Sequence, residues 1–195
     1  MNKYIFFLLA FLYGSVSFAQ KTTDPELTKR LNAYLRLTRE SKFNELMDYT
    51  HPKIFTIMPR EQLVEIMEKS FDNDQMTIGI DSIGTTTISP DFVLKTARYK
   101  KIGYWMVISV VFKDTTVTSD ESFVARATSS FEKGFPGAKV YFNPNTKHFE
   151  IRATSLMIAI KDSPAKPWYF LGYQRDEALL NKLYPKEVIA HFKLL

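Results

Sequence analysis

The segment from Ile102 to Lys113 restricts the possible folds more than any other part of the chain. Its even-numbered positions are all apolar: Ile102, Tyr104, Met106, Ile108, Val110 and Phe112. Alternation with a period of two predicts a long β-strand that packs one face on the core. The odd-numbered positions also include Trp105, Val107 and Val111. Because a strand that is apolar on both sides is usually covered on both sides, we expect two layers around this strand.

Helical patterns flank this strand. Asp24-Pro25-Glu26 combines a cap acceptor, a proline at the first helical position and an early acid, which is typical of a helix start. Helices are predicted over residues 24–39, 41–51 with Ser41 as its cap, 59–71, 119–133, 178–183 and 188–192. The inward face of the third is predicted to carry Leu63, Ile66, Met67, Ser70 and Phe71.

Further strands are predicted over residues 76–80, 85–89, 140–142, 147–161 and 168–171. Within 147–161 the apolar set changes from odd-numbered to even-numbered positions, which predicts a β-bulge near Thr154 and Ser155. The order of elements predicts an α+β fold. In it, N-terminal helices pack on a long, bent antiparallel sheet that forms a cone, and short helices end the chain.

The N-terminus has the pattern of a secretory signal peptide over residues 1–19. Lys3 precedes the apolar run Ile5–Tyr13, and Ser17 and Ala19 stand at the −3 and −1 positions of a cleavage site. The run is shorter than the about 20 apolar residues that a membrane-spanning helix needs. We therefore expect an exported protein, periplasmic or extracellular, with no membrane anchor after cleavage and one domain over 20–195.

Several kinds of site are excluded because the residues that they require are absent from the sequence. The chain has no cysteine, which excludes disulfides, thiolate metal sites and cysteine nucleophiles. His51, His148 and His191 are far apart and form no metal-binding motif, and no glycine-rich phosphate loop is present. We expect no metal and no cofactor.

Residues 95–105 interleave basic and aromatic side chains, a composition that suits single-stranded nucleic acid. A solvated loop that leads into a core strand explains the same pattern. With an exported chain of net charge +5, we expect no nucleic-acid ligand.

Three polar side chains are candidates for a site inside the sheet. His51 follows Phe43 and Met47 at helical spacing, and Asp48 precedes it by one turn, where a carboxylate can orient an imidazole. Tyr34 lies on the inward face of the first helix, and Tyr104 lies on the apolar side of the long strand. Tyr34, His51 and Tyr104 are thus the pocket candidates, with His51 as the weak catalytic candidate. The alternative is that His51 ends its helix before Pro52 and that both tyrosines bond to nearby backbone.

The layout resembles the nuclear transport factor 2-like superfamily, which includes the SnoaL-like proteins. The resemblance is carried by residues 32–71, by Met157–Asp162 (MIAIKD) and by Trp168–Leu171 (WYFL), within 24–192. It implies a cone-shaped domain that binds a small apolar ligand in the cone or a protein partner on its sheet, without catalysis. The alternative that it implies is a lyase, isomerase or hydrolase with His51 as general base. The predicted helix over 119–133 departs from the simplest form of this family.

A homodimer through the outer sheet face is a further expectation. The helices before the long strand can cover one side of it. Trp105, Val107 and Val111 on the other side then need either the helix over 119–133 or a second subunit.

Overall fold

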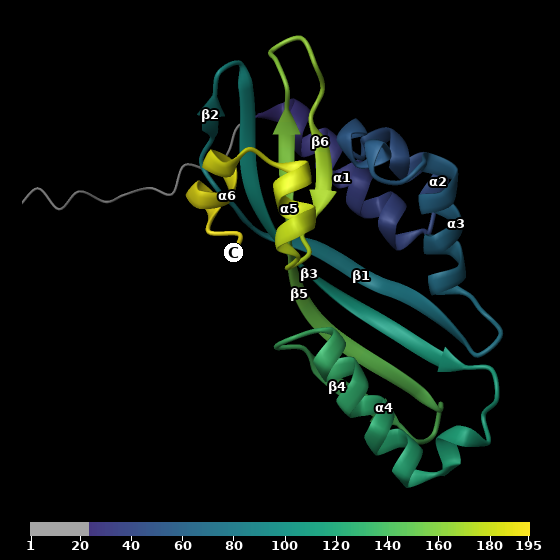
Figure 1. Cartoon of the computed structure of the whole chain (residues 1–195). Helices are drawn as coiled ribbons and strands as arrows, with labels where there is room; N and C mark the ends of the chain where they lie inside the picture. The colour runs from purple at the N-terminus through teal and green to yellow at the C-terminus, as the bar shows by residue number, and fades with distance from the viewer. Residues whose placement is uncertain (1–23) are drawn as a thin grey trace, which may run out of the picture.

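The computed structural model describes residues 24–195. The predicted signal peptide and its cleavage site lie outside the described residues. Figure 1 shows an α+β fold in which helices pack on a long, bent sheet, as the sequence predicts. None of the helices within 24–195 has the length and apolar character needed to cross a membrane.

The N-terminal helical layer contains α1 (Pro25–Arg39), α2 (Phe43–Leu46) and α3 (Arg60–Phe71), with 3₁₀ turns η1 (Met47–Tyr49) and η2 (Pro52–Thr56) between α2 and α3. The predicted start of α1 is confirmed. Pro25 occupies its first turn, and the Asp24 carboxylate accepts a hydrogen bond from the Leu27 N–H at 3.0 Å. A polar N-cap of this kind satisfies one of the free N–H groups of the first turn.

The sheet has six strands: β1 (Met76–Ile88), β2 (Phe92–Leu94), β3 (Ala97–Phe112), β4 (Lys139–Asn143), β5 (His148–Lys161) and β6 (Tyr169–Gly172). All pair antiparallel in the order β1-β3-β5-β4, with β2 beside β3 and β6 beside β5. The turn η3 (Val117–Ser119) and helix α4 (Glu121–Gly134) connect β3 to β4, and α5 (Glu177–Leu183) and α6 (Lys186–Phe192) end the chain.

Two helical units cover one face of this sheet, at opposite ends. Ile102 of β3 packs in a core with Leu27, Leu31 and Leu35 of α1. Ile108, six positions further along the same strand, packs in a core with side chains of α4. Even-numbered positions share a face, so α1 and α4 cover the same face. Figure 1 shows α4 at the far end of β3 and β5 from α6.

The other face is covered at one end by α5 and α6. Ile158 and Ile160 of β5 pack with Leu180, Leu183 and Val188, whereas their neighbours Met157 and Ala159 pack in the α1 core. This end of β5 is therefore buried on both faces. The change from an odd-numbered to an even-numbered apolar set reflects this double cover.

The predicted β-bulge near Thr154 and Ser155 is wrong. The pairing of β3 with β5 runs without a register shift from Arg98 opposite Lys161 to Val111 opposite His148. The irregularities lie instead in β1, between Ile80 and Ser82 and between Thr85 and Thr87. The sequence predicts two strands over 76–80 and 85–89, but they form this one strand. On a bent sheet an edge strand follows a different path from its neighbour, and the two shifts accommodate that difference.

Two details of the helices also differ from the prediction. Ser41 does not cap α2, because it has a positive φ of 53° and Lys42 occupies the cap position. On α3, Leu63, Met67 and Phe71 pack inward as predicted, together with Val64. Ile66 is 44% exposed, and Ser70 is also exposed, with its hydroxyl bonded to the Ile66 carbonyl within the helix.

Candidate functional site

A pocket of about 370 Å³ lies between α1 and the edge strand β1. The residues of helix α1 that line the pocket are at helical spacing and lie on one side of the helix. They are Asn32, Leu35, Arg36 and Arg39. Strand β1 contributes Ile83, Gly84 and Thr85. These three residues lie in the segment 82–85, between the two register shifts of β1. The irregular edge strand therefore forms one wall of the pocket, as bulged strands often do beside binding sites.

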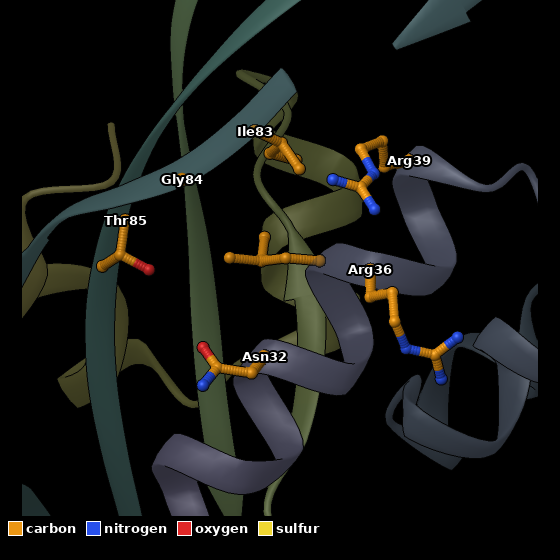
Figure 2. A pocket seen from close by; sticks show the side chains of 7 residues that line it. Asn32, Arg36, Arg39, Ile83, Gly84 and Thr85 are labelled. Atoms are coloured by element: carbon orange, nitrogen blue, oxygen red, sulfur yellow. The ribbon is translucent and has the colours of Figure 1, made fainter. Parts of the chain in front are cut away.

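The pocket combines apolar and polar groups. Leu35 is buried, and Ile83 packs against the same core. Figure 2 shows the Asn32 amide and the Thr85 hydroxyl directed toward each other across the opening. The Arg39 guanidinium extends over the pocket toward Ile83, whereas the Arg36 side chain points away from it. Arg36 bonds to Glu40 at 2.8 Å.

His51 lies outside the predicted helix, in extended backbone on the edge of the sheet. Its N–H donates to the Phe170 carbonyl at 3.1 Å. Its Nδ1 accepts a hydrogen bond from the Lys53 N–H at 3.2 Å and so caps η2. The proton is then on Nε2, which lies 3.2 Å from an Asp162 carboxylate oxygen. His51 is thus a buried capping residue. The alternative interpretation of the sequence gave it a structural role at the end of a helix before Pro52, whereas it caps the turn that begins at Pro52.

Asp48, the nearby carboxylate that could orient His51, faces outward and does not contact it. The Asp48 carboxylate bonds to the Arg60 guanidinium at 2.7 Å, on the surface of the helical layer. The carboxylate at His51 comes instead from Asp162, at the end of β5, and about half of that side chain is exposed. A separation of 111 residues between the two partners explains why no local spacing indicates this pair.

Tyr34 and Tyr104 do come together, in the core between α1 and β3. The Tyr34 ring packs on Phe170, with ring centroids 5.0 Å apart. Burial, together with the nearby Tyr104, raises the pKa of the Tyr34 hydroxyl well above its usual value. Burial also raises the pKa of Tyr104. Both hydroxyls are therefore neutral at physiological pH, and neither acts as a base there.

The three predicted candidates do not form the pocket. Tyr34 and Tyr104 belong to the α1 core, His51 is bound to Asp162, and none of the three lines the cavity between α1 and β1. Sequence reasoning missed Asn32, Arg39 and Thr85. Arg36 and Arg39 have the ordinary position of basic residues in the last turn of a helix, where they complement its dipole. The wall of the pocket depends on the irregularities of β1, which the sequence pattern places in another strand.

The basic stretch 95–105 is largely used within the fold. Arg98 and Lys100 both bond to the Asp91 carboxylate, at 2.5 Å and 2.9 Å. Lys101 donates to the Phe192 carbonyl at 2.9 Å. Since these cations have partners within the protein, they are poorly placed to contact phosphates.

Within residues 24–195, no three histidine, aspartate or glutamate side chains gather in a way that could hold a metal ion.

A stability prediction follows from the two bonds of His51. His51→Ala is expected to lower the free energy of unfolding by about 1–2 kcal/mol, because it removes a cap and a partly solvated hydrogen bond. His51→Asn serves as the matched control, since its side chain can still accept from the Lys53 N–H but is too short to reach Asp162. It should recover about half of the loss. Urea denaturation of both variants measures the difference, and equal stability of His51→Ala and the wild type would contradict this assignment.

No protein-family model matches the chain, and no curated protein is similar enough to match it.

Proposed function

We propose that this protein is an exported, non-catalytic domain that binds a small molecule in the pocket between α1 and β1. The observation that carries the proposal is the pocket itself. Its volume of about 370 Å³ falls within the range of small-ligand sites, and it combines an apolar wall with a few convergent polar groups. The order of three helices followed by a bent sheet supports membership of the nuclear transport factor 2-like superfamily.

The surroundings of His51 favour binding over catalysis. A general base needs a free nitrogen within reach of the proton that it removes. One ring nitrogen of His51 accepts from the Lys53 N–H, and the other is directed at Asp162. Enzymatic activity as a lyase, isomerase or hydrolase would require these bonds to open. His51 also lies away from the pocket, so a bound ligand would not meet it.

A protein partner on the outer sheet face is the second candidate. The C-terminal helices cover one end of this face, and Trp105 and Tyr141 lie on the remaining part with 39% and 47% of their surface exposed. Val107 and Val111 share this face and are half-buried. Exposed aromatic side chains in one area are typical of protein interfaces. We propose a second copy of this chain as the partner.

Native mass spectrometry of the full-length gene product, recovered after export, tests these proposals together. The expected result is a chain that begins at Gln20, forms a dimer and carries the added mass of a small compound. Thr85→Trp, which fills the pocket, should abolish the added mass, and Thr146→Trp in the exposed turn before β5 should not. Trp105→Lys should give a folded monomer.

Each proposal has its own contrary result. Retention of Met1 would contradict export. A wild type that is already monomeric would contradict the dimer. Protein that carries no added mass as purified, and gains none from the small-molecule fraction of a cell extract, would contradict ligand binding.

A further inference from the structure

The charges around the pocket are unbalanced. Two arginines line it, and its described lining contains no acidic side chain. Arg36 is bound to Glu40 at 2.8 Å, and the same carboxylate also receives Lys42 at 3.3 Å. Arg39 has no carboxylate within ion-pair distance among residues 24–195. The pocket therefore contains one guanidinium whose charge is available to a ligand.

Two uncharged polar groups accompany this guanidinium. Figure 2 shows the Asn32 amide on α1 and the Thr85 hydroxyl on β1 facing each other. The Arg39 guanidinium lies at another part of the opening, beside Ile83. Amide N–H and hydroxyl groups donate to anionic oxygens, and a guanidinium presents a planar set of donors that matches a carboxylate or a phosphate. The pocket thus offers donors from three side chains on two elements.

The rest of the pocket is apolar. Leu35 and Ile83 form its inner wall at the edge of the α1 core. An inorganic ion would leave this wall exposed to water. A ligand with a short hydrocarbon part would cover the wall while its charged end meets Arg39.

We propose that the pocket binds a small organic anion, with a carboxylate or phosphate head held by Arg39, a short apolar part on Leu35 and Ile83, and the Asn32 amide and Thr85 hydroxyl as polar neighbours at the other side of the opening. This inference rests on the proposed function, because it assigns the class of ligand to the same pocket. Because the pocket is open and holds one available guanidinium, we expect weak binding. The affinity should decrease as salt is added, since solvent-exposed charges are screened.

The test is an NMR titration of the protein labelled with ¹⁵N, using hexanoate, butyl phosphate and hexanamide as probes. Hexanamide has the same shape as hexanoate but no charge. The expected result is that hexanoate or butyl phosphate shifts the amide signals of Gly84 and Thr85, while hexanamide does so at much higher concentration. The anion that binds at the lower concentration shows whether the pocket prefers a carboxylate or a phosphate head group.

Arg39→Met and Arg126→Met form a matched pair of variants. Methionine keeps the apolar stem and removes the guanidinium in both. Arg39→Met should weaken binding of the anion about tenfold or more, as expected for loss of a charge-assisted hydrogen bond. Arg126→Met should change it little, because Arg126 is exposed on α4 and does not line the pocket.

Three results would overturn the inference. If hexanamide binds as tightly as hexanoate, or if Arg39→Met binds the anion like the wild type, the pocket does not select anions, and the proposed small-molecule binding still stands. If none of the probes shifts Gly84 or Thr85, the anion proposal also fails. The native mass measurement then decides independently whether the pocket holds any ligand.

Discussion

Replacing Trp168 with alanine is expected to lower the free energy of unfolding by about 3–5 kcal/mol, in the range of large-to-small changes in a well-packed core. Trp168 is fully buried in the core formed by α1, β3, β5 and β6. Its Nε1–H donates to the Asp24 carboxylate at 3.1 Å, and the Arg98 guanidinium lies over its ring at 5.2 Å. The substitution removes this packing and also removes one of the two hydrogen bonds that the Asp24 carboxylate accepts.

The chain offers a matched control in its second tryptophan. Trp105 lies on the outer sheet face with 39% of its surface exposed. At protein concentrations below those at which the chain dimerises, Trp105→Ala should cost clearly less than Trp168→Ala, because part of its ring is already exposed in the single chain and loses less packing when it is removed. Urea denaturation followed by far-UV circular dichroism compares the two variants without relying on either fluorophore. Equal losses would show that Trp168 does not have the structural role described here.

Phe149→Ala is expected to cost a similar amount, about 3–5 kcal/mol, at the other end of the sheet. Phe149 is fully buried and contacts three aromatic rings, those of Phe112, Phe131 and Phe142. Phe131 belongs to α4, so the ring of Phe149 is a main contact between this helix and the sheet. Its loss leaves a cavity under α4, and ring pairs of this kind add stability beyond the area that they bury.

Two measurements distinguish a local from a global effect. Phe149→Leu keeps most of the side-chain volume and should cost about 1.5 kcal/mol or less. Hydrogen exchange of Phe149→Ala should show faster exchange in α4 than in α1, because the cores that hold the two helices share no buried residue. If α1 and α4 lose protection from hydrogen exchange equally, the two ends of the sheet unfold as one unit. The prediction that their cores are energetically separate would then be wrong.

Local patterns in the sequence predicted most of the elements. The Asp24-Pro25 start of α1, the helical pattern of α4 and the alternation along β3 each depend on residues close together in the chain. Propensity, capping and periodicity describe such features well. The α+β fold class followed from their order.

Three of the failures involve partners that are distant in the sequence. The apolar switch in β5 indicates a bulge only if one face of the strand is covered, and α5 and α6 cover the second face. Helical spacing places His51 on the face of Phe43 and Met47, but a bridge of Thr50 with Phe170 holds this segment on the edge of the sheet. The pocket needs both α1 and the irregular part of β1, and neither segment alone indicates it.

The bond between Asp24 and Trp168 also bears on the order in which the structure can form. The two residues are 144 positions apart, yet together they complete the first turn of α1 and the core beneath it. During synthesis from the N-terminus, α1 is made first but its final partner appears only when β5 and the turn after it have been made. An isolated helix of this length is marginal in water. The core on which the N-terminal helix packs is therefore complete only when the last quarter of the chain has been made. A chain truncated before Trp168 lacks both Trp168 and Phe170 from this core.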